Sequence, residues 1–176
     1  MNKKTLFLGL FVITFSFLPL ASVKAEDNEI TEEKISNVET NCHSIKETLK
    51  RVQNSDRNSR VSIGRYYQTA LTDFITPLNV RLVKSNLFNA ELADIQTNYA
   101  SARETFNRDY ISYSQSLEEL LSKNCVSDPE GFYLKLEETR EKRVKVAESS
   151  AKVQEILNQH INSVNSLYES FKSGEE

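Results

Sequence analysis

The two cysteines of this 176-residue chain, Cys42 and Cys125, are the first residues whose chemistry the sequence suggests. In an oxidising compartment two cysteines favour a disulfide, and we predict that these two pair. Free thiols and a bond between two chains remain open alternatives. A metal site is a poorer interpretation, because His43 would be the third ligand and adjacent residues on a helix point about 100° apart.

Four charged residues occupy or adjoin the apolar faces described below: Asp56, Asp109, Arg140 and Arg143. Counted inward from the end that carries the cysteines, Asp56, Asp109 and Arg143 lie 14 to 16 residues along their helices. A guanidinium paired with a carboxylate is an economical way to place charge near a core. We predict a buried polar layer that fixes the register of the helices. Ordinary solvated faces, or a site for an anionic or polar ligand, are the other interpretations.

No arrangement of residues resembles a catalytic site. The chain has two histidines, His43 and His160, and neither stands in a Ser/His/Asp pattern. His160 falls near the level of Asp73, but a single histidine on a helix is usually structural. The sequence also lacks the GxSxG, HExxH, CxxC and glycine-rich phosphate-binding motifs. We therefore expect no enzyme activity, no cofactor and no bound metal.

The N-terminus has the three parts of a secretory signal. Residues 1–4 form a short basic region, residues 6–21 are uncharged and rich in apolar side chains, and Val23 and Ala25 place compact or small side chains at the −3 and −1 positions of a cleavage site. We predict a cleaved signal peptide over residues 1–25 and a mature chain in the periplasm, at the cell surface or in the medium. A retained membrane anchor is the alternative, although the apolar run is shorter than the roughly 20 residues that a spanning helix needs.

The charge balance restricts the class of partner. Without residues 1–25 the chain carries 19 basic and 25 acidic side chains, a net charge of −6 with neutral histidines. Nucleic acids and anionic membranes both attract a basic face, so we expect neither as a partner. We expect the protein to be attached to a membrane only if the N-terminal segment stays uncleaved.

The pattern of apolar residues predicts three long helices. The chain has only four Gly and three Pro, where average usage would give about 12 and about 9. Few turn residues predict few, long elements, and apolar residues recur at steps of mostly three and four, as on one face of a helix. The three rows are Ile35, Val38, Cys42, Ile45, Leu49, Val52, Ile63, Tyr67, Leu71, Phe74, Leu78 and Leu82; Leu92, Ile95, Tyr99, Ala102, Phe106, Tyr110, Tyr113, Leu117 and Leu120; and Phe132, Leu136, Val144, Ala147, Ala151, Leu157, Ile161, Val164, Tyr168 and Phe171.

Two features interrupt the first row. Residues 54–60 are wholly polar, and Pro77 lacks an N–H and clashes with the preceding turn, so we predict a helix that is kinked or split near both. Residues 84–89, ending in an N-cap asparagine, and residues 125–128, followed by Pro129, are the predicted connections. Short connections imply antiparallel neighbours. The predicted fold is all-α, an elongated antiparallel three-helix, coiled-coil-like bundle over residues 26–172, with a frayed tail at 173–176.

These properties predict an exported, non-enzymatic interaction or structural protein. Its helix faces would bind a protein partner or a second copy of the chain. A periplasmic-type helical chaperone for unfolded or envelope clients and a single-pass anchored ectodomain are the alternatives.

Overall fold

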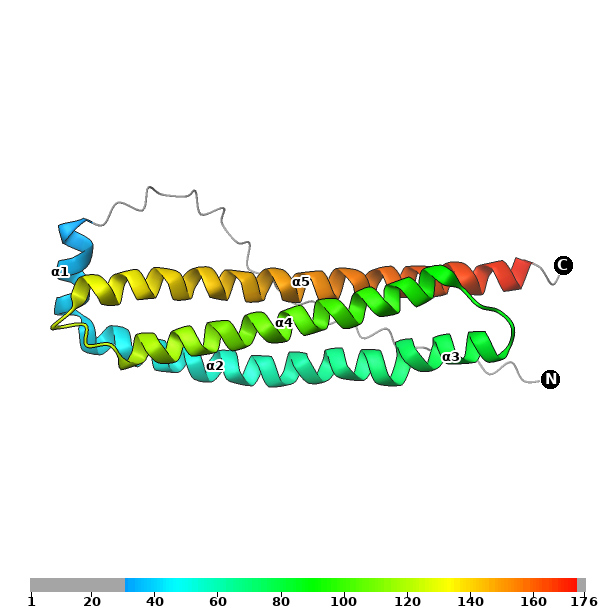
Figure 1. Cartoon of the computed structure of the whole chain (residues 1–176), viewed down its shortest axis with the longest axis horizontal. Helices are drawn as coiled ribbons and strands as arrows, with labels where there is room; N and C mark the ends of the chain where they lie inside the picture. The colour runs from blue at the N-terminus through cyan, green and yellow to red at the C-terminus, as the bar shows by residue number, and fades with distance from the viewer. Residues whose placement is uncertain (1–30, 174–176) are drawn as a thin grey trace, which may run out of the picture. The chain divides into compact units, whose positions relative to one another are not determined.

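The computed structural model describes residues 31–173, and this part of the chain is helical with no strand. It therefore confirms the all-α prediction for these residues. The predicted signal peptide lies outside the described residues, and of the predicted frayed tail only Ser173 is described, as the last residue of a helix. The elements in chain order are α1 (Glu32–Thr40), α2 (Cys42–Thr69), a π-helical segment (Ala70–Ile75), α3 (Thr76–Lys84), α4 (Ala90–Ser122) and α5 (Pro129–Ser173) (Figure 1).

Helices α4 and α5 pack closely against each other, and α2 lies against α4 (Figure 1). The chain reverses direction between α3 and α4 and again between α4 and α5 (Figure 1). Buried side chains of these helices meet in two clusters, one along the middle of the helices and one near the cysteines. The first cluster contains Tyr67, Ala70, Ile75, Ile95, Tyr99, Phe106, Val153, Ile156 and Leu157, and the second Val38, Tyr113, Leu117, Leu120, Cys125, Phe132 and Leu136.

Both predicted helix starts are present. The side chain of Asn89 accepts a hydrogen bond of 2.9 Å from the backbone N–H of Leu92 and caps α4. Asp128 accepts one of 3.0 Å from the N–H of Gly131, and Pro129 is the first residue of α5. A side-chain acceptor satisfies an N–H that has no partner inside the helix, and proline loses nothing at that position. Local sequence therefore determines where α4 and α5 begin.

The end of α3 also has a local cause. Asn86 has a φ of 56°, the left-handed conformation that asparagine tolerates better than most residues. The N–H of Leu87 donates to the carbonyl of Leu82 at 2.8 Å and that of Asn86 to Val83 at 3.1 Å. These two bonds form a Schellman motif, which satisfies the last carbonyls of a helix.

The predicted interruption at residues 54–60 is wrong, because α2 runs through this segment without a break. The segment contains neither proline nor glycine, and two of its polar side chains make contacts with other helices: Asp56 with α5 and Arg60 with Asn107 of α4. The break in the first stretch falls instead at Asn41, between α1 and α2.

The predicted disturbance at Pro77 is present as a π-helical segment of six residues, Ala70–Ile75. Proline cannot donate to the carbonyl four residues earlier and clashes with it. The wider turn, in which Thr76 donates to Leu71, accommodates the ring. The step between core positions becomes five residues, so Ile75 is fully buried and Phe74, predicted as a core residue, is 66% exposed.

The predicted apolar row of α5 is wrong in its middle and also at its C-terminal end, where Ile161, Tyr168 and Phe171 are exposed. In the middle, Val144, Ala147 and Ala151 are exposed, and the buried face there carries Thr139 and Ser149. Both hydroxyls donate to carbonyls one turn earlier in α5, Thr139 at 2.7 Å and Ser149 at 2.9 Å. Because their hydrogen bonds are satisfied within the helix, these small polar residues can lie in the core.

Candidate binding groove

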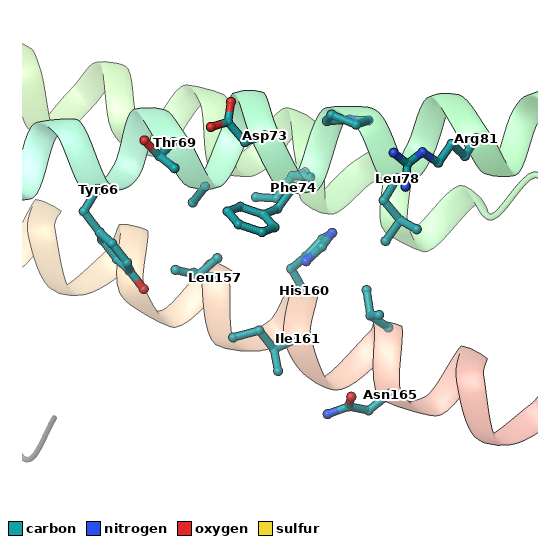
Figure 2. Close-up of a pocket in the computed structure, with 14 residues that line it drawn as sticks. Tyr66, Thr69, Asp73, Phe74, Leu78, Arg81, Leu157, His160, Ile161 and Asn165 are labelled. Carbon is teal, nitrogen blue, oxygen red and sulfur yellow. The ribbon is translucent and has the colours of Figure 1, made fainter. Parts of the chain in front are cut away.

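An open groove with a volume of about 510 Å³ lies between the π-helical segment and α3 on one side and residues 157–165 of α5 on the other (Figure 2). Its size is within the range of roughly 300–1,000 Å³ that is usual for ligand pockets. The residues that form it are predominantly apolar, with a few polar side chains among them. It is lined by Tyr66, Thr69, Ala70, Asp73, Phe74, Ile75, Pro77, Leu78, Arg81, Leu157, His160, Ile161, Val164 and Asn165.

The π-helical segment positions the most exposed aromatic side chain of the groove. The five-residue step gives the core position to Ile75 and turns Phe74 onto the groove. Ile161, on the opposite wall, is 48% exposed, and Figure 2 shows the two side chains on facing helices. Large apolar side chains that line a concave surface and remain exposed are typical of a binding surface.

His160 lies on the α5 wall of this groove with only 6% of its surface exposed (Figure 2). Its Nε2 atom is buried and makes no hydrogen bond among the described residues. Burial lowers the pKa of the imidazole from its ordinary value of 6.5, because a buried site disfavours the charged form. His160 is therefore a neutral side chain at neutral pH.

We expect His160 to make the fold sensitive to acid. The unfolded chain binds a proton at this residue at a higher pH than the folded chain, so the free energy of unfolding falls as the pH drops below 6.5. His160→Leu, of similar bulk and without polar atoms, should reduce this loss. Urea unfolding between pH 7.5 and 5 gives the free energy of unfolding of the native protein and of the variant. The difference between the two should change by at most about 1.4 kcal/mol per pH unit. Parallel curves would contradict the expectation.

Away from the groove, the structure brings together two of the four residues of the predicted polar layer. Arg143 donates to Asp56 through Nε at 2.8 Å and through a terminal nitrogen at 3.0 Å, and the Tyr113 hydroxyl donates to the same carboxylate at 2.7 Å. Burial and the carboxylate of Asp56 raise the pKa of Tyr113 above its ordinary value of 10.0. Its phenol therefore stays a hydrogen-bond donor. These contacts join α2, α4 and α5 at one level.

The other two predicted members do not join this contact. Arg140 is exposed and pairs with Glu137 of its own helix. It also lines a second groove, of about 390 Å³, beside α1 and α2. Asp109 is half-buried and makes no hydrogen bond or ion pair within residues 31–173. The spacing along the helices found the level but not the direction of each side chain, so a four-residue layer is wrong.

We expect the Asp56–Arg143 pair to be coupled in stability. Both single alanine variants should unfold more easily, and a double-mutant cycle should give a coupling energy of about 1 kcal/mol, because the bidentate pair is partly exposed to water. Chemical denaturation of the four proteins measures it. Arg140→Ala, on the same helix but outside the contact, should change the stability by less than about 0.5 kcal/mol. A coupling energy near zero would mean that the pair does not hold the helices together.

The structure places the two cysteines as a disulfide between the start of α2 and the connection that precedes α5. The Cα atoms of Cys42 and Cys125 are 5.6 Å apart, a usual separation for such a bond. Cys125 is fully buried in the cluster near this end. In this position the bond ties the α1–α2 junction to the turn between α4 and α5.

Within residues 31–173 no three His, Cys, Asp or Glu side chains gather where they could hold a metal ion. In the same range no helix is long and apolar enough to cross a membrane.

Sequence reasoning missed the groove because it assigned Phe74 and Ile161 to the core and regarded His160 as structural, although it placed His160 near the level of Asp73. The scarcity of glycine and proline gave no sign of it. The one local signal was Pro77, which requires a disturbance in the turn before it.

Comparison of the chain with known proteins finds no match to a family model, to a curated protein or to a solved structure.

Proposed function

We propose that this protein is an exported, non-enzymatic interaction module that holds its partner in the apolar groove beside α3 and α5. Its scaffold is an antiparallel three-helix bundle made by α2 to α3, α4 and α5. The observation that carries the proposal is the groove itself, an open concave surface with Phe74 and Ile161 exposed on facing walls.

Two properties support binding at the groove, and a third supports export. The groove is largely apolar, so a partner gains by removing its surface from water. The buried clusters of α2, α4 and α5 hold its walls from below. The single disulfide, far along the chain from the groove, is typical of proteins that work in an oxidising compartment.

Site-specific photo-crosslinking tests the proposed surface in the native cell fraction. A photoreactive residue at Phe74 should capture a partner, because that side chain is 66% exposed on the groove. The matched control is Val144, which is 56% exposed on α5 and does not line the groove. Equal capture at the two positions, or none at either, would count against the groove as the binding surface.

A helical chaperone is the second candidate, because exposed apolar side chains in an open groove also suit unfolded clients. The two functions differ in selectivity. A chaperone should suppress the aggregation of a denatured model protein, and Phe74→Asp should abolish this effect while Val144→Asp leaves it unchanged. A lack of suppression at stoichiometric excess would eliminate this candidate.

A further inference from the structure

The groove continues into an uncovered apolar stripe on the last turns of α5. Ile161 and Val164 line the groove, and Tyr168 and Phe171 follow on the same helix and are exposed. Their spacing of three, four and three residues places them on one face. Groove and stripe together form one apolar surface that no other element of residues 31–173 covers.

The rim of the groove carries two opposite charges. Arg81 lies at the α3 end of the groove and Asp73 near the middle of the same wall, with Phe74 and Leu78 between them; Tyr66 and Thr69 continue the wall beyond Asp73 (Figure 2). They are eight residues apart, about 12 Å along a helix. Both side chains are exposed, and neither makes an ion pair within the described residues; Asp73 accepts a hydrogen bond only from its neighbour Thr72. The rim therefore has no net charge, but its negative and positive charges are separated along the groove.

This polarity suits a second copy of the same chain. Two copies related by a two-fold axis that passes between Asp73 and Arg81 run antiparallel, so Asp73 of one copy meets Arg81 of the other. In such an isologous interface every contact occurs twice. The exposed Phe74 of each copy faces the apolar groove of the other. The rest of the mature chain is acidic, so a neutral, polarised patch is where two copies approach with the least repulsion.

We propose that the groove is the interface of a two-fold symmetric homodimer in which Asp73 of each copy pairs with Arg81 of the other. This inference rests on the proposed function, because it accepts the groove as the binding surface and names its occupant. The dimer covers Phe74, Ile161 and the stripe beyond them, and it joins two scaffolds at the ends that lie away from their disulfides.

Charge reversal at the two rim positions tests the pairing on the purified native protein. Asp73→Arg and Arg81→Asp each replace two attractive pairs by two repulsive ones, so each should raise the dimer Kd by about tenfold at low salt. Equimolar mixing of the two variants makes both pairs attractive again and should restore association as a heterodimer. Sedimentation equilibrium over a concentration series measures the dimer Kd of each variant and of their mixture.

Controls separate the specific pair from overall charge. Glu148→Arg and Lys145→Asp make the same changes in net charge on exposed positions of α5 outside the groove, and they should leave the dimer Kd unchanged. The difference between the rim variants and the native protein should vanish near 1 M salt, where exposed charges are screened. Circular dichroism should show the same helix content in every variant, because the substituted side chains are exposed.

The outcomes distinguish this inference from the proposed function. A purified protein that stays monomeric while Phe74 still captures another molecule in the native fraction would overturn the homodimer and leave the groove as a binding surface. A monomer with no capture at Phe74 would overturn both. A dimer that the rim variants do not weaken, or that mixing does not restore, would place the interface elsewhere.

Discussion

Loss of the Cys42–Cys125 disulfide should lower the free energy of unfolding by about 4 kcal/mol. The bond joins residues 83 positions apart. In the chain-entropy model, closing a loop of this length raises the free energy of the unfolded state by about 4.5 kcal/mol. The total free energy of unfolding of a typical domain is only about 5–15 kcal/mol. The disulfide would therefore supply a large part of the stability, and the melting temperature should fall by about 15 °C.

The double variant Cys42→Ala/Cys125→Ala tests this expectation by chemical and thermal unfolding. Alanine is preferable to serine because Cys125 is fully buried, and a buried hydroxyl without a partner adds its own cost. Reduction of the native protein should produce the same loss, and a reductant should have no effect on the double variant. If reduction leaves the native melting temperature unchanged, the bond does not contribute as argued.

Truncation of Phe106 should destabilise the protein by about 3–5 kcal/mol, the range for removing a large aromatic side chain from a core. Its side chain is only 2% exposed and belongs to the middle cluster. The ring packs edge-to-face on Tyr67 with 5.6 Å between centroids, and the guanidinium of Arg60 lies 5.8 Å from its centroid. Phe106→Ala therefore removes contacts between α2 and α4 and leaves a cavity where they meet α5.

The matched control is Ile111→Ala on the same helix. Ile111 is 56% exposed, so its truncation should change the stability by less than about 0.5 kcal/mol. Phe106→Leu retains much of the buried volume and should lie between the two. Urea unfolding gives the three values. A cost below about 1 kcal/mol for Phe106→Ala would mean that the middle cluster does not hold the helices together.

The positions of α4 and its two connections follow from local sequence. Every apolar residue of the row from Leu92 to Leu120 is buried or half-buried. The cap at Asn89 is formed by the side chain that the sequence marks, and the cap at Asp128 lies in the connection predicted before Pro129. Periodicity worked here because α4 lies between other helices, so that its apolar face coincides with its buried face. Capping depends only on residues within one turn, so it can be predicted without the tertiary structure.

Tertiary packing decided the rest. In α5 the core accepts Thr139 and Ser149 and leaves Val144 exposed, because hydroxyls can be satisfied within the helix and a helix buries only the face that meets its neighbours. At Pro77 the sequence predicts a disturbance, but only the three-dimensional structure shows a π-helical turn that buries Ile75 and exposes Phe74. Likewise, spacing placed Asp56 and Arg143 at one level, and rotation about each helix axis decided that these two meet while Arg140 points to solvent. By itself the sequence determined α4 and the starts of α4 and α5, which depend on neighbouring residues, whereas the groove depends on how the faces of α3 and α5 are turned.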